Sequence, residues 1–118
     1  MPKQTIIIPL SGGGSVTGIW SAPPEAASGW VFGYAPSAGS NIGDPFRTYA
    51  APRLLDAGIS TLHFQFPYME TGTTWPDRPN VLEGAWHEMI ALLHGHRKRV
   101  LIGGRSMGGR YAFRVVSD

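Results

Sequence analysis

The 118-residue sequence contains no cysteine. Disulfide bonds, thiolate metal sites and a cysteine nucleophile are therefore excluded, and folding does not depend on an oxidising compartment. Ten basic and eight acidic residues give a net charge of only +2, an excess too small to imply a polyanionic partner. The apolar run within MPKQTIIIPL is too short for a signal peptide or a membrane span. We expect a cytoplasmic protein that binds neither nucleic acid nor membrane.

A composition of 42% hydrophobic and 15% charged residues is typical of one globular domain, which we place at residues 1–118. The expected strands are Thr5–Leu10, Val16–Trp20, the apolar run in GWVFGYAP, Ile59–Tyr68 and the run RVLIGG. The turn SGGGS joins the first two strands as an antiparallel hairpin. Strands alternate with helices in the later part of the chain, which predicts an α/β fold with a mainly parallel sheet of about five strands.

Three helices are expected between and after these strands. The first covers FRTYAAPRLLDAG, with Gly58 at its C-terminal cap, and Pro52 either kinks this helix or marks its true first turn. For the second helix, Asn80 is the expected cap and Glu83 completes a capping-box pattern, with Gly95 at the end. The third helix opens in MGGRYAFRVVSD.

The run Gly104-Arg105-Ser106-Met107-Gly108 has the G-x-S-x-G form of a nucleophile elbow. An apolar strand precedes it and an amphipathic pattern follows, which is the strand-turn-helix context that this turn requires. Close backbone approach at the bend accounts for Gly104 and Gly108, since a residue without Cβ fits there. The backbone N–H of Met107, at a helix N-terminus, points where an oxyanion would form. This arrangement predicts acyl transfer with Ser106 as the nucleophile.

A second oxyanion donor is expected from YAPSAGS, the loop after the third strand. Its residues are small, and the backbone N–H of Ala38 is the expected donor. A plainer interpretation makes Pro36–Ser40 only a turn and GGRSMGG only a tight strand–helix junction. Two distant segments agree on one site, so we favour the catalytic interpretation.

The segments YAPSAGS, FQFPYMETGTTWPDRPNVLEGAW and LIGGRSMGGR together resemble the small α/β-hydrolases of the dienelactone-hydrolase-like type over about residues 30 to 114. The resemblance implies that Ser106 is the nucleophile, that Met107 is an oxyanion donor, and that Tyr68 and Met69 lie near the mouth of the site. The family loop usually reads H-G-A-G, whereas Pro36-Ser37-Ala38-Gly39 stands here, which keeps the backbone donor but changes its surroundings. Further expected lining residues are Ser37 and Gly39.

The resemblance also shows what the sequence lacks. In α/β-hydrolases the acid and the histidine of the triad follow the serine in the chain, but here only Asp118 follows Ser106 among acids, and no histidine follows. We therefore expect a truncated α/β-hydrolase fold, corresponding to the amino-terminal half, with the general base unknown. For the upstream histidines we expect structural roles: packing or hydrogen bonding under a helix, facing solvent, or lying at the C-terminus of a helix. These histidines are His63, His87, His94 and His96.

The sequence thus predicts a serine esterase acting on small carboxylic esters, without cofactor or metal. Its activity would be weak, or would depend on a second chain for the base, because an unactivated serine is a poor nucleophile. The strand before Ser106 would be an open apolar edge, so we expect a homodimer or higher homo-oligomer. The alternative is a non-catalytic module that keeps the hydrolase scaffold and binds itself or a partner through this edge.

Overall fold

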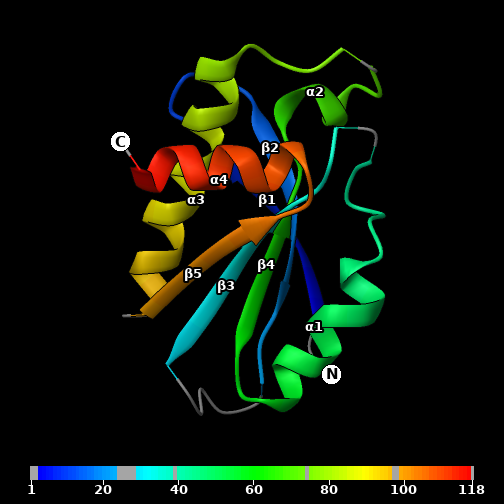
Figure 1. The fold of residues 1–118 in the computed structure, drawn as a ribbon, viewed down its shortest axis with the longest axis vertical. Coiled ribbons are helices and arrows are strands. Elements are labelled where there is room, and N and C mark those ends of the chain that lie inside the picture. The colour runs from blue at the N-terminus through cyan, green and yellow to red at the C-terminus, as the bar shows by residue number, and fades with distance from the viewer. Residues whose placement is uncertain (1–2, 24–28, 39, 74, 97–98, 118) are drawn as a thin grey trace.

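The structure is a computed structural model that describes residues 3–23, 29–38, 40–73, 75–96 and 99–117. A five-stranded sheet lies at its centre, with helices on both faces (Figure 1). The strands are β1 (Lys3–Pro9), β2 (Ser15–Ser21), β3 (Trp30–Ala35), β4 (Ser60–Phe64) and β5 (Arg99–Gly104). The helices are α1 (Phe46–Asp56), α2 (Pro67–Glu70), α3 (Pro79–His96) and α4 (Met107–Ser117).

The strands lie in the order β1-β2-β4-β3-β5 across the sheet. β1 and β2 form an antiparallel hairpin, β2 also pairs antiparallel with β4, and β4, β3 and β5 are parallel. The predicted α/β fold with an antiparallel first hairpin and a mainly parallel remainder is confirmed. Because the parallel strands end on the same side of the sheet, the segments that follow β3, β4 and β5 lie near one another at that side.

The hairpin turn between β1 and β2 is built on glycine. Gly13 and Gly14 have φ values of 103° and 76°, a region that side chains with a Cβ rarely adopt. Leu10 closes the turn on both sides: its N–H donates to the Gly14 carbonyl, and its carbonyl accepts from the Gly13 N–H, each at 3.0 Å. The SGGGS segment is therefore the turn that the sequence predicted.

Two apolar layers hold the helices against the sheet. α3 and α4 cover one face, where Trp86, Met89 and Leu93 of α3 are completely buried in the larger core cluster. α1 covers the other face, where Phe46 stacks on Tyr34 of β3 with ring centroids 4.0 Å apart. Figure 1 shows the sheet between these two layers. No described helix is both long enough and apolar enough to span a bilayer.

β4 is shorter than the predicted strand Ile59–Tyr68. It ends at Phe64. The next residue, Gln65, still bonds to β2, because its N–H donates to the Thr17 carbonyl at 3.2 Å. Pro67 then starts the one-turn helix α2 as its first residue. A proline has no N–H to offer a strand ladder but fits the first helical position, so the predicted end of this strand is wrong.

α1 begins at Phe46 and runs through Pro52, so Pro52 does not mark the first turn. The Asp44 carboxylate accepts the Phe46 N–H at 2.8 Å and thereby supports the start of the helix. At the other end Gly58 has a φ of 82°, and its N–H donates to the Leu55 carbonyl at 2.9 Å. This left-handed position after the last turn confirms the predicted glycine cap.

The predicted cap of the long helix is wrong by two residues. α3 begins at Pro79, and the Arg78 carbonyl accepts the N–H groups of residues 81 and 82, so Asn80 lies inside the first turn. A proline is favoured at the first helical position because its missing N–H would have no helical partner there. Glu83 instead pairs with Arg114 of α4 at 3.1 Å. The helix continues through Gly95 to His96.

Candidate active site

Ser106 lies at a sharp bend between β5 and α4. Its φ is 50°, and it is the only non-glycine residue with positive φ in the described part of the chain. This left-handed conformation is strained for a residue with a Cβ and persists only where the surroundings enforce it. The Ser106 side chain is exposed, while the next residue, Met107, is buried at the start of α4. The bend therefore presents a hydroxyl at the end of a strand.

The bend is packed against the backbone that leaves β3. A Cβ on Gly104 would come within 2.4 Å of the Ala35 carbonyl oxygen, and one on Gly108 within 2.3 Å of the same atom. The Arg105 N–H donates to this oxygen at 3.2 Å. Only glycine tolerates such contacts, so the two glycines of the motif let the loop after β3 approach Ser106.

α3 supports the bend from the other side. The indole Nε1–H of Trp86, which is completely buried, donates to the Gly108 carbonyl at 3.2 Å. As the first residue of α4, Met107 has an N–H that the helix itself does not use. The helix N-terminus also carries partial positive charge, so an anion that forms beside Ser106 would be stabilised there.

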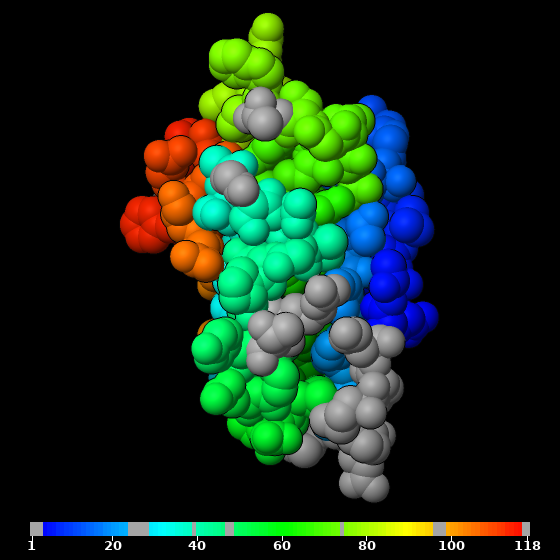
Figure 2. All heavy atoms as spheres, turned by 90° about the vertical axis from the view of Figure 1, so that its right-hand side faces the viewer, coloured from blue at the N-terminus to red at the C-terminus, as the bar shows by residue number. Residues whose placement is uncertain are grey.

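The loop after β3 is held by a tyrosine from α2. The Tyr68 hydroxyl donates to the Ala38 carbonyl at 2.9 Å, and both residues line a cavity of about 220 Å³ together with Met69. Within the loop, the Ser40 N–H donates to the Ser37 carbonyl at 3.0 Å. Figure 2 shows the segment between β3 and α1 on the surface, next to the segment around α2.

The predicted site residues thus fall into two groups. Ala38, Tyr68 and Met69 come together around the small cavity, and Ser106 is not among the residues that line it. The two groups are linked through the backbone of Ala35. This residue lies three positions before Ala38 in the chain and is in close contact with Gly104 and Gly108. The predicted lining residue Gly39 lies outside the described residues, as does Asp118.

Tyr68 is itself fixed by an acidic residue. Its backbone N–H donates to Asp77 Oδ2 at 2.9 Å, and its ring is 5% exposed. Burial and, to a smaller extent, the negative charge of Asp77 raise the pKa of the Tyr68 phenol above its ordinary value. The hydroxyl therefore stays protonated, and remains a hydrogen-bond donor, across the neutral pH range.

A buried polar pair near the elbow was not found from the sequence. The Tyr34 hydroxyl donates to Asp44 Oδ1 at 3.1 Å beneath α1, and Asp44 is 2% exposed. Burial, then the charge of Asp44 and this hydrogen bond, raise the pKa of Tyr34, while the positive charge of Arg105 opposes the rise. The only sequence signal was an aspartate two residues before a helix, which is typical of capping and does not reveal a tyrosine partner.

The three histidines whose side chains the structure describes occupy the expected surroundings. His63 is 2% exposed in β4 and makes edge-on ring contacts with Tyr34 and Phe46, so it packs under α1 as predicted. It is paired with Tyr34, which is paired with Gly103, so two strand spacings of roughly 4.8 Å separate it from β5. His87 and His94 are exposed on α3. The His96 side chain lies outside the described residues.

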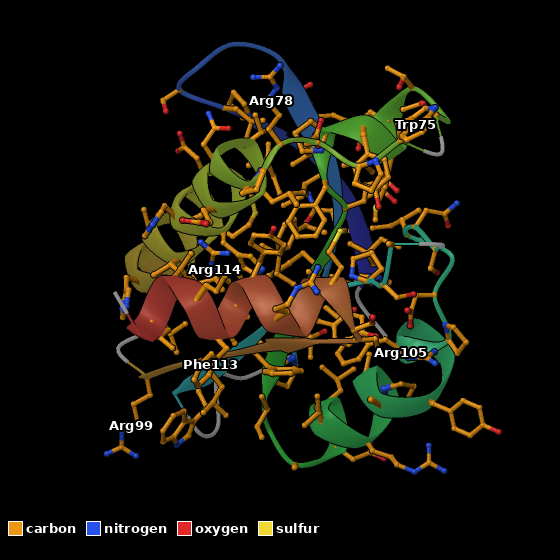
Figure 3. The ribbon with its side chains drawn as sticks, turned by 45° about the horizontal axis from the view of Figure 1, so that its top comes forward. Trp75, Arg78, Arg99, Arg105, Phe113 and Arg114 are labelled. Carbon is orange, nitrogen blue, oxygen red and sulfur yellow. The ribbon has the colours of Figure 1, made fainter. Side chains whose placement is uncertain are left out.

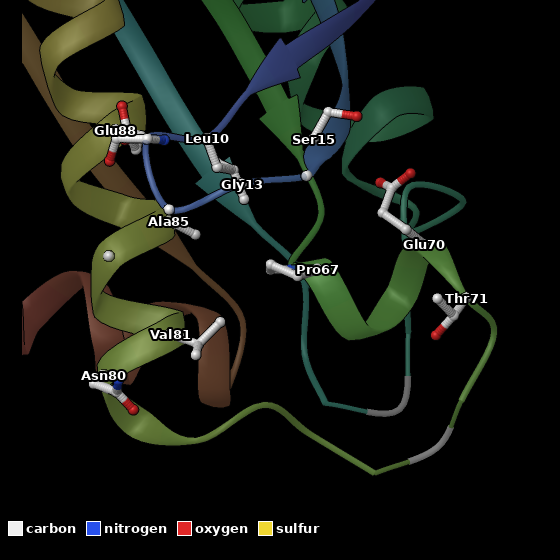
Figure 4. Close-up of a pocket in the computed structure, with 14 residues that line it drawn as sticks. Leu10, Gly13, Ser15, Pro67, Glu70, Thr71, Asn80, Val81, Ala85 and Glu88 are labelled. Atoms are coloured by element: carbon white, nitrogen blue, oxygen red, sulfur yellow. The ribbon is translucent and has the colours of Figure 1, made fainter.

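A cavity larger than the one beside Tyr68 lies elsewhere. It measures about 600 Å³, is open to solvent, and is lined by the β1–β2 turn, α2 and the first half of α3 (Figure 4). Leu10, Val81 and Ala85 supply apolar surface, and Glu88 at the rim accepts the Ser11 N–H at 2.8 Å. None of the described residues predicted for the site lines this cavity. We place the candidate site at the strained serine, because strain and close glycine contacts occur there.

The comparisons with known proteins agree with this fold. The family profile of the α/β hydrolase domain matches residues 29–118, and the chain belongs to that family. The predicted family resemblance is thereby confirmed. Among curated proteins, no match was found.

Solved structures of α/β-hydrolases superpose well on the chain. An α/β serine hydrolase without a lid from Xanthomonas campestris gives a TM-score of 0.80 at 17% identity, covering 99% of this chain and 57% of its own. An α/β serine hydrolase homologue from Coxiella burnetii gives 0.78 at 16% identity, covering 98% and 58%. A dienelactone hydrolase from Anabaena variabilis gives 0.77 at 18% identity, covering 97% and 56%. The chain thus spans little more than half the length of these three structures.

Proposed function

We propose that the protein is a serine hydrolase that acts on small carboxylic esters in the cytoplasm. Ser106 would attack the ester carbonyl, and the N–H groups of Met107 and Ala38 would donate to the oxyanion. The observation that carries this proposal is the left-handed Ser106 (φ 50°) between β5 and α4, with the backbone after β3 packed against Gly104 and Gly108. Membership of the α/β hydrolase family supports it.

The proposed reaction is acyl transfer through a covalent intermediate. The serine oxygen would bond to the carbonyl carbon, the alcohol would leave with a proton, and water would then release the acid. No cofactor or metal is needed for these steps. The general base is not assigned, because His63 packs under α1 and His87 and His94 are exposed on α3. Oxyanion donors alone retain about 10³-fold acceleration over water, so we expect weak activity.

An active-site-directed fluorophosphonate tests the nucleophile. We expect one label per chain on the wild type, with loss of both label and ester hydrolysis in Ser106→Ala. Ser11→Ala, which changes an exposed serine in the β1–β2 turn, is the matched control and should label like the wild type. Labelling that persists in Ser106→Ala, or a wild type that never reacts, would refute the assignment.

A second candidate function is association through the open edge of the sheet. β5 is an edge strand, and Leu101 on it is 44% exposed. Phe113 and Val116 of α4 are 70% and 63% exposed, so apolar surface lies beside a strand whose outer edge pairs with no other strand among the described residues. Such an edge favours pairing with another chain. We propose a second copy of this chain as the partner, which is compatible with hydrolysis and does not replace it.

A further inference from the structure

We propose that Tyr68 is a positioning residue for the oxyanion-binding loop, acting through the carbonyl of Ala38. This inference rests on the proposed function, because it assigns the Ala38 N–H to the oxyanion. Tyr68 comes from α2, thirty positions further along the chain, and its hydroxyl reaches the loop at 2.9 Å. It would not contact the reacting atoms; it would fix the residue that does.

The hydrogen bond constrains the part of the loop that matters. A carbonyl and the N–H of the same residue flank one Cα, and only the φ and ψ of that residue relate their directions. Fixing the Ala38 carbonyl therefore restricts how the Ala38 N–H can turn. Ala38 is exposed, and small residues are restrained little by their own side chains. The Tyr68 bond supplies the restraint that packing of the Ala38 side chain does not.

Tyr68 can act in this way because α2 is anchored by contacts that do not involve Ala38. The backbone N–H of Tyr68 donates to Asp77 Oδ2 at 2.9 Å. At the end of α2, Glu70 accepts the Thr17 N–H at 2.7 Å and the Thr17 hydroxyl at 2.9 Å. The ring is buried, at 5% exposure. The phenol is thus carried on a turn that is tied both to β2 and to the segment after α2.

Among its described residues, the loop has hydrogen-bonded ties to its surroundings at Ala35, Ala38 and Ile42. The Ala35 carbonyl accepts the N–H of Arg105, the residue before Ser106, at 3.2 Å. The Ala38 carbonyl accepts a hydrogen bond from the Tyr68 hydroxyl. The Ile42 N–H donates to Gln65 Oε1 at 3.0 Å. The Gln65 amide in turn donates to Glu70 at 2.7 Å. Of the three ties, only that from Tyr68 is at the proposed donor residue.

Tyr68→Phe removes the hydroxyl and leaves the ring, so it tests the hydrogen bond alone. With a small activated ester such as p-nitrophenyl acetate, we expect kcat to fall about tenfold while KM stays within about twofold, because the lost restraint acts on the transition state. The affinity for a boronic acid, which forms a tetrahedral adduct on the serine, should fall by the same factor. The matched control is Tyr49→Phe, at a tyrosine that is 69% exposed on α1.

Amide hydrogen exchange tests the positioning without relying on activity. In Tyr68→Phe, a peptide that covers residues 36–42 should exchange faster than in the wild type, and in Tyr49→Phe it should not. If the wild type hydrolyses esters, an unchanged kcat in Tyr68→Phe overturns the proposal, as does a rise in KM alone, which would indicate substrate contact. If the wild type is inactive, the proposed function fails, and unchanged exchange in Tyr68→Phe then overturns the positioning role as well.

Discussion

At the scale of single residues, Gly108 lies in close contact with the backbone that leaves β3. A Cβ there would lie 2.3 Å from the Ala35 carbonyl oxygen and 2.6 Å from that of Pro36. Both atoms belong to backbone and cannot rotate away like a side chain. Overpacking of this kind displaces the loop after β3 from the elbow.

We therefore expect Gly108→Ala to lower the free energy of unfolding by about 3 kcal/mol. Chemical denaturation monitored by circular dichroism measures this change. Gly84→Ala is the matched control: Gly84 lies in α3, and an alanine methyl there would have nothing within 4 Å, so alanine should raise stability by up to about 1 kcal/mol. Equal stability of Gly108→Ala and wild type would show that the loop does not pack against the elbow.

At the scale of elements, α1 carries an interior proline. Pro52 is the seventh residue of a helix that starts at Phe46, so it removes one helical hydrogen bond and crowds the preceding turn. Pro52 is exposed, which means that its ring adds little burial to offset this loss.

Pro52→Ala should raise the free energy of unfolding by about 2 kcal/mol, since the gain in the helix exceeds the added freedom of the unfolded chain. Thermal and denaturant unfolding report the change. Pro79→Ala is the control, because Pro79 occupies the first position of α3, where no helical bond is lost. A Pro52→Ala protein no more stable than Pro79→Ala would contradict this account of α1.

The sequence was informative where one local pattern settled the conformation. The hairpin glycines and the Gly58 cap were predicted because each needs a left-handed residue that glycine alone adopts easily. The end of β4 was missed because Phe64 and Phe66 continue the alternation of a strand, while Pro67 starts a helix. The start of α3 was missed because two rules competed, and Pro79 at the first position outweighed Asn80 as a cap.

Contacts between distant segments were harder to predict from the sequence. The strand-turn-helix geometry around Ser106 could be predicted from the run Gly104 to Gly108, because strand, turn and helix are contiguous there. The bond from Tyr68 to Ala38 joins residues thirty positions apart, and neither residue type carries a signal for the other. The buried pair of Tyr34 and Asp44 was missed for the same reason. Such pairs follow from the order of the strands, which periodicity does not specify.

At the scale of the whole molecule, the sheet has two edges of different character. β1 forms one edge and contains Pro9, which offers no N–H to a neighbouring strand. β5 forms the other edge, where Leu101 and the α4 residues Phe113 and Val116 are exposed. In Figure 3, Arg114 points from α4 toward α3, and Phe113 points away from it. Among the described residues, apolar surface is therefore richer at the β5 edge, and we expect the proposed self-association to use that edge.

Leu101→Lys combined with Phe113→Ser should weaken dimerisation of the 118-residue chain at least about tenfold, because a charge replaces buried apolar contact at the proposed interface. Sedimentation equilibrium over a range of concentrations measures the dissociation constant. Ile7→Lys, at a residue 66% exposed on the β1 edge, should leave it unchanged. If Ile7→Lys disrupts the dimer while the double variant does not, the interface lies at β1; if the wild type is monomeric throughout, the chain does not pair with itself. Either result removes the β5 edge as a route by which a second copy could bring a histidine to Ser106.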